Sequence, residues 1–150
     1  KFEIKEKEFD FIPMTDFPFP NKIDGKVVTI GTTAAFVKAS TGYCFSRTQE
    51  KIKKIIKALQ TKGKIEESDI NSPYHFRLFD SAMLEVTGKG IVPGEQFFIS
   101  LFRKMTPEFL FRFLDEKASL REIIKTMLSS PGKEKLIVAT LRKLMLGKKI

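Results

Sequence analysis

A run of small and hydroxyl-bearing residues after a short apolar segment is the part of this sequence best suited to hold a ligand. Val27–Ile30 is β-branched and apolar, which predicts a buried strand that ends at Gly31. Tyr43 starts a helix-like segment whose first N–H groups favour negative charge, and small side chains in between let a ligand approach the backbone. The pattern predicts either a turn for an extended anionic ligand or an ordinary tight connection within a core. The small residues are Thr32, Thr33, Ala34, Ala35, Ser40, Thr41 and Gly42.

Other residue types that often do chemistry lack the partners they need. His75 is the only histidine and Cys44 the only cysteine, so the sequence offers no histidine metal site, no Ser–His triad and no internal disulfide. The acidic residues at 66–69 and 115–116 fall in predicted linkers or helix ends, where a solvated surface is the expected environment. We therefore predict no metal site and assign no catalytic residue.

The elements that would position the turn are N-terminal strands followed by a mainly helical region, an α+β arrangement. Residues 1–12 alternate charged and apolar side chains and predict a half-exposed strand, and Asp24-Gly25 predicts a turn. From Tyr43 the apolar period is helical as far as Gly63, and residues 64–71 predict a polar linker. Proline and capping signals predict five further helices over about 72–87, 93–103, 106–114, 119–128 and 130–146.

Composition limits the partners more than it limits the fold. The chain has 150 residues, 42% of them apolar, which suffices for one domain with a real core. Its net charge of +9 suits nucleic acid, an anionic membrane surface or a phosphate-bearing ligand, and no apolar run is long enough to cross a bilayer. Fifteen phenylalanines without a tryptophan fit an ordinary core or a cover for a large apolar ligand. Because the basic residues lack exposed aromatics and known binding motifs around them, we predict no nucleic-acid partner.

The last predicted helix is both basic and amphipathic. Residues 130–146 carry Lys133, Lys135, Arg142 and Lys143 beside a set of apolar side chains. Such a helix packs its apolar face on its own domain or lies on an anionic membrane. The sequence pattern leaves both interpretations open.

Two short motifs, Ile12-Pro13-Met14 and Ser40-Thr41-Gly42-Tyr43, are the most specific of several segments that lie in order along nearly the whole chain. Together these segments resemble the later part of the bacterial lycopene cyclases, flavin-dependent enzymes that act on carotenoids. The likeness continues through FPFP (residues 17–20), the glycine turn of residues 30–49, FRLFDSAMLEV (76–86), QFFISLF (96–102) and FRFLDEKASL (111–120).

The resemblance implies that the glycine turn and the helix after it form the second flavin-contacting segment of a larger FAD-binding, Rossmann-type protein. The cofactor would be reduced FAD. Most of its site would lie upstream of Lys1, because the strand, G-x-G-x-x-G turn and helix of a dinucleotide fold do not occur here. The residues implied on the flavin side are Gly31, Thr32, Ala34, Ser40, Thr41, Gly42 and Tyr43, and those implied in the substrate cavity are Ile12, Pro13, Met14, Phe17 and Phe36.

The implied function is carotenoid biosynthesis by a lycopene beta-cyclase, an isomerase-type enzyme of which this chain is the C-terminal part. Protonation of a terminal double bond of lycopene gives a cation that closes into an ionone ring, and the acidic residues for this step are expected upstream. We expect residues 1–71, with the strands and the flavin segment, and residues 72–150, the helical region, to form one continuous part of a longer chain. The part alone is expected to be inactive, and the location to be cytoplasmic, with peripheral contact to the inner face of the membrane as an option.

Two alternatives follow from the same residues. The chain fits another flavoprotein of the same superfamily, an isoprenoid reductase or a halogenase, and product analysis would distinguish these. It also fits a basic helical module without catalysis that binds a membrane or nucleic acid. Such a module would need no flavin, and its affinity would fall steeply with salt.

Overall fold

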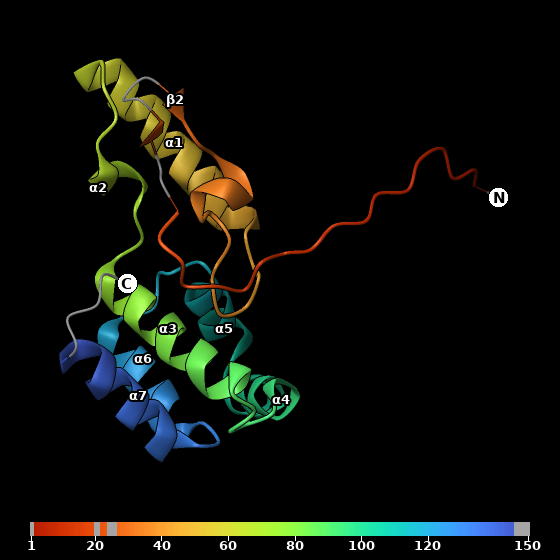
Figure 1. The fold of residues 1–150 in the computed structure, drawn as a ribbon, viewed down its shortest axis with the longest axis vertical. Helices are drawn as coiled ribbons and strands as arrows, with labels where there is room; N and C mark the ends of the chain where they lie inside the picture. The colour runs from red at the N-terminus through yellow and green to blue at the C-terminus, as the bar shows by residue number, and fades with distance from the viewer. Residues whose placement is uncertain (1, 20–21, 24–26, 146–150) are drawn as a thin grey trace.

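The computed structural model describes residues 2–19, 22–23 and 27–145, and this part of the chain is mainly helical (Figure 1). The hairpin, α1 and α2 lie at one end of the molecule, and α4, α6 and α7 lie at the other. The elements are β1 (Lys22–Ile23), β2 (Val27–Val28), the 3-10 helix η1 (Gly31–Ala34), α1 (Phe45–Lys62), α2 (Glu67–Ile70), α3 (Tyr74–Gly88), α4 (Gly94–Lys104), α5 (Pro107–Leu114), α6 (Leu120–Ser129) and α7 (Lys133–Met145).

The predicted α+β class is wrong, and so is the predicted strand over residues 1–12. Residues 2–12 belong to no helix or strand, and the first residues of the chain extend away from the helices (Figure 1). An alternating pattern forms a strand only where a neighbouring edge accepts its hydrogen bonds. Here β2 pairs antiparallel with β1 in the register Lys22↔Val28 and Ile23↔Val27. This two-stranded hairpin is the one sheet of the described residues, which contain no Rossmann-type parallel sheet.

The expected buried strand before the glycine turn is also shorter and more exposed than its composition predicts. Only Val27 and Val28 are in β2, and the side chains of Val27 and Ile30 are 54% and 57% exposed. A strand of two residues places one side chain, Val28, against a hydrophobic core and leaves Val27 and Ile30 exposed. The turn predicted at residues 24–25 lies outside the described residues.

The helix signals, by contrast, predicted the helices well. Gly63 ends α1 in the left-handed conformation at φ 65°, and its N–H donates to the carbonyl of Leu59. Thr106 caps α5, and Ser119 and Glu122 form the predicted capping box of α6. The polar linker predicted for residues 64–71 is wrong, because it contains α2 and buries Ile65 and Ile70.

The described residues have two hydrophobic cores. The larger lies among α3–α7, where α3 packs along α7 (Figure 1), and it spans residues 76–139. The smaller lies among η1, α1 and α2 and spans residues 34–70. Buried ion pairs connect the two parts: Lys38 with Asp80, and Arg47 with Glu116. Polar contacts therefore fix how α1 and its preceding loop sit on the helical bundle. The expected division at residues 71 and 72 stays a prediction.

Candidate functional site

A buried ion pair anchors the loop that carries the Ser-Thr-Gly-Tyr motif. The Lys38 ammonium donates to Oδ1 of Asp80 at 2.6 Å, and the hydroxyl of Ser40 donates to the same oxygen at 2.7 Å. Lys38 is fully buried, with its Nζ 4.8 Å from the ring centre of Phe113 and 5.5 Å from that of Phe76. Burying a charge is costly unless it is paired and hydrogen-bonded, and aromatic faces add further stabilisation. The loop is therefore held against α3 by a satisfied polar cluster.

The loop closes on itself through its backbone. The N–H of Lys38 donates to the carbonyl of Tyr43 at 2.7 Å, and the carbonyl of Lys38 accepts from the N–H of Gly42 at 2.9 Å. Gly42 has a φ of 73°, which a glycine adopts without strain. The Thr41 hydroxyl accepts from the N–H of Tyr43, and the Tyr43 hydroxyl is 3.1 Å from that of Ser46. The side-chain oxygens of this loop are thus engaged within the protein.

The glycine turn before the loop is a 3-10 helix, η1. Gly31 has a φ of 71°, and a Cβ placed on it would meet no atom within 4 Å. Ala35 ends the turn in the left-handed conformation, with its N–H donating to the carbonyl of Thr32 at 3.1 Å. Of the predicted flavin-side residues, Thr32 is exposed and Ala34 lies in the smaller core. The side of the turn open to a ligand is therefore formed by Gly31, Thr32 and Thr33.

The Ile-Pro-Met segment lies against the Ser-Thr-Gly-Tyr loop. A Cβ placed on Gly42 would be 3.7 Å from Cγ2 of Ile12. Four residues later, a carboxylate oxygen of Asp16 accepts a hydrogen bond from the Ser81 hydroxyl of α3 and lies 3.3 Å from Nζ of Lys143 in α7. The structure thus brings together two motifs that are about thirty residues apart in the sequence.

The remaining residues predicted for the substrate cavity are divided between surface and core. Pro13, Met14 and Phe17 are exposed beside Ile12, and the ring of Phe17 meets that of Phe19 edge-on with 5.1 Å between centroids. Phe36, in contrast, is fully buried in the smaller core. Phe17 is therefore accessible from solvent, and Phe36 is covered by protein.

Two cations of α1, Arg47 and Lys51, are buried, although the sequence pattern predicts that the lysines of this helix, Lys51 among them, lie mostly away from its apolar face. Arg47 forms an ion pair with Glu116 at 3.0 Å and donates to Ser72 at 2.8 Å. Lys51 has its Nζ 4.9 Å from the Phe36 ring centre and 3.4 Å from the carbonyl oxygen of Ala35. Burial lowers the pKa of Lys51 to about 8, and the charge of Arg47 adds to this effect.

A spacing signal points to these cations in the sequence. Arg47 and Lys51 precede the buried Ile55 at intervals of four residues, so all three side chains lie on the same face of the helix.

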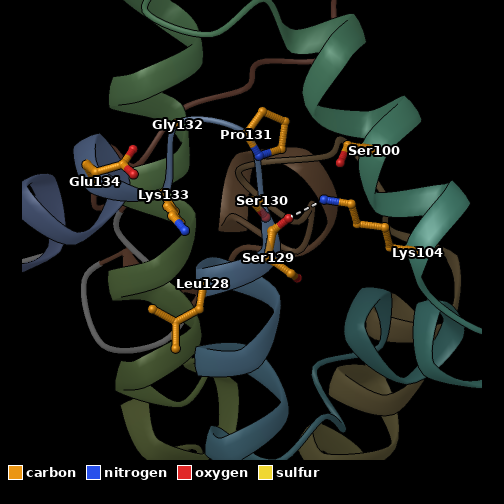
Figure 2. A pocket seen from close by; sticks show the side chains of 9 residues that line it. All are labelled: Ser100, Lys104, Leu128, Ser129, Ser130, Pro131, Gly132, Lys133 and Glu134. Carbon is orange, nitrogen blue, oxygen red and sulfur yellow. Dashed lines mark hydrogen bonds between the residues drawn. The ribbon is translucent and has the colours of Figure 1, made fainter.

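A cavity of about 560 Å³ lies elsewhere, between α4 and the connection from α6 to α7 (Figure 2). The Lys104 ammonium crosses it and donates to the carbonyl of Ser129 at 2.6 Å. Most of its other walls are polar, so it does not suit a hydrocarbon, and none of the predicted site residues lines it. Its lining residues are Ser100, Lys104, Leu128, Ser129, Ser130, Pro131, Gly132, Lys133 and Glu134.

A scan against protein-family models matches residues 1–139 to the family described as lycopene cyclase protein. The chain belongs to this family. The match includes both the Ile12–Met14 motif and the Ser40–Tyr43 motif, so the resemblance found in the sequence is confirmed. The comparison with curated proteins found no match, and neither did the comparison with solved structures.

Membership in the lycopene cyclase family assigns this protein to carotenoid cyclisation and implies a carotenoid substrate. In the part of the chain that the structure describes, no helix has both the length and the apolar character needed to span a bilayer. The same residues contain no cluster of side chains suited to hold a metal ion.

Proposed function

We propose that this lycopene cyclase uses reduced FAD to convert the end groups of lycopene into β-ionone rings. Family membership supports the carotenoid chemistry. The observation that carries the proposal is the close approach of the Ile12 side chain to Gly42, because it brings the substrate-side motif next to the flavin-side motif. A lycopene end group would then lie where these two segments meet.

The open side of the glycine turn fits a flavin. The empty space beside Gly31 lets a ligand approach the backbone, and Thr32 is exposed next to it. The hydroxyl groups of Ser40 and Tyr43 and the N–H groups of residues 41–43 are all engaged within the protein, so the loop would pack against the cofactor rather than donate these hydrogen bonds to it. When bound, reduced FAD would supply an electron-rich ring system beside the reacting end group, without net transfer of hydrogen.

This chain's own residues would shield and orient the end group. Ile12, Met14 and Phe17 are apolar and exposed, and Ile12 lies beside the loop, so this segment can cover a hydrocarbon and keep water from a cation. The aromatic faces of Phe17 and Phe19 can stabilise positive charge. Shielding from water and stabilisation of positive charge would thus both act on the lycopene end group.

Asp16 is not the proton donor in this proposal. Burial raises the pKa of this carboxyl group, but the hydrogen bond from Ser81 and the charge of Lys143 outweigh that effect, so its pKa lies below the ordinary value. Asp16 is therefore ionised at neutral pH, where an acid catalyst must hold its proton. No acidic residue of this chain is assigned the role of protonating lycopene.

The test is product analysis with the full-length protein, lycopene and reduced FAD. We expect a product of the same mass as lycopene that carries β-ionone rings, and no product when flavin is left out. A product with added hydrogen or halogen would instead favour the reductase or the halogenase. Cyclisation at the same rate without flavin would refute the cofactor proposal while leaving the family's reaction in place.

We also propose that α7 meets an anionic membrane surface, where lycopene resides. Leu136 and Ala139 of this helix are buried in the larger core, so part of its apolar face packs on the bundle. Val138 and Leu141 are nevertheless 60% and 52% exposed, and Met145 is 82% exposed. Lys133 and Lys135 are exposed and give the helix positive charge that complements acidic lipid headgroups, whereas Arg142 and Lys143 are ion-paired with Glu85 and Asp16.

Replacing Val138 and Leu141 together with serine is expected to weaken binding to phosphatidylglycerol vesicles about thirtyfold. Roughly half of each side chain would be buried in the membrane, worth about 1 kcal/mol each. Co-sedimentation of the full-length protein with vesicles measures this change in membrane affinity. The matched control replaces Ile99 and Phe102, which are exposed on α4 at the other side of the bundle, and should bind like the parent protein. Equal binding of both variants, or equal binding to neutral phosphatidylcholine vesicles, would contradict the proposal.

A further inference from the structure

Two neighbouring residues of α3 each hold one of the two motif-bearing segments. Asp80 accepts hydrogen bonds from Lys38 and Ser40, on the loop of the Ser-Thr-Gly-Tyr motif. Ser81 donates to Asp16, two residues after the Ile-Pro-Met motif. Asp80 and Ser81 are 3% and 0% exposed, whereas the side chain of Asp16 is 43% exposed, so the Asp80 contacts are made inside the protein and the Ser81 contact at its surface. A single short stretch of one helix therefore anchors both sides of the candidate site.

The geometry of a helix explains how one element reaches two segments. Consecutive helix residues point about 100° apart, so Asp80 and Ser81 face different neighbours while the helix backbone fixes the spacing between them. The helix itself is held by Phe76, Phe79 and Met83, which are all buried in the larger core. A change in the position of α3 would move the loop and the N-terminal segment together.

We propose that α3 sets the spacing between the flavin side and the lycopene side of the site, with Ser40 and Ser81 as positioning residues. This inference rests on the proposed function, in which flavin meets the loop and lycopene meets residues 12–17. Ser40 acts through Asp80, and Ser81 acts through Asp16. Since both hydroxyl groups are turned into the protein, neither contacts a ligand directly.

The experiment compares three serine-to-alanine variants of the full-length protein, each of which loses one internal hydrogen bond. Ser40→Ala is expected to raise the Kd for FAD about fivefold and to leave the KM for lycopene unchanged. Ser81→Ala is expected to raise the KM for lycopene about fivefold and to leave the Kd for FAD unchanged. The control is Ser130→Ala, whose hydroxyl donates to the carbonyl of Thr126 far from both motifs, and it should change neither constant.

Amide hydrogen exchange of the ligand-free protein provides a readout that needs neither flavin nor lycopene. Residues 41–43 should exchange about fivefold faster in Ser40→Ala, and residues 14–16 about fivefold faster in Ser81→Ala. If these rates change as expected but the parent protein binds no flavin, the proposed function fails and the positioning role stands. Unchanged exchange rates, or equal changes of Kd and KM in both variants, would overturn the inference.

Discussion

Replacing Asp80 with asparagine is expected to lower the free energy of unfolding by about 3–5 kcal/mol. The variant leaves the Lys38 ammonium, which is fully buried, without its counter-charge. Breaking one side of a buried ion pair costs this much because the remaining charge stays away from water. The amide oxygen of asparagine still accepts hydrogen bonds, so the lost stability reports the charge itself. Urea unfolding followed by far-ultraviolet circular dichroism measures it.

A second variant separates the charge effect from a loss of packing. Combining Lys38→Met with Asp80→Asn removes both charges and keeps an apolar side chain near Phe113 and Phe76. Most of the lost stability should return, since apolar replacements of buried ion pairs are often neutral. A loss below about 1 kcal/mol for Asp80→Asn alone would show that the pair is not buried as described.

The stability of the protein is expected to rise between about pH 8 and about pH 10.5 by as much as about 3 kcal/mol because of Lys51. The pKa of Lys51 is about 8 in the folded state and 10.5 without its burial. In this pH range the folded state has released the proton of Lys51 while the unfolded chain still binds it. Since the unfolded state binds more protons, raising the pH favours folding. The shift of roughly 2.5 pKa units corresponds to about 3 kcal/mol.

The measurement is the pH dependence of urea unfolding, compared between the parent protein and Lys51→Met. The rise attributed to Lys51 should be absent from the variant, whatever other groups titrate in the same range. Lys57→Met is the control, because Lys57 is exposed on the same helix, and it should follow the parent protein. A difference between parent and Lys51→Met that stays constant with pH would show that Lys51 is solvated in the folded state.

The sequence by itself determined the α-helices other than α2, and the family. Helix ends depend on residues within three or four positions, as at Gly63 and in the capping box of Ser119 and Glu122, so local patterns predict them. The same holds for the two motifs, Ile12–Met14 and Ser40–Tyr43, which are short enough to be found without a structure and lie within the family match.

Only the tertiary structure decided which strands form and which charged residues are buried. Residues 2–12 have an alternating pattern but no neighbouring edge to pair with, which composition cannot reveal. Lysine is a residue type usually found on the protein surface, yet Lys38 and Lys51 are both buried. The partner of Lys38 is Asp80, 42 residues further along the chain. Whether a lysine lies on the surface or in an ion pair depends on such distant partners, and folding alone brings them together.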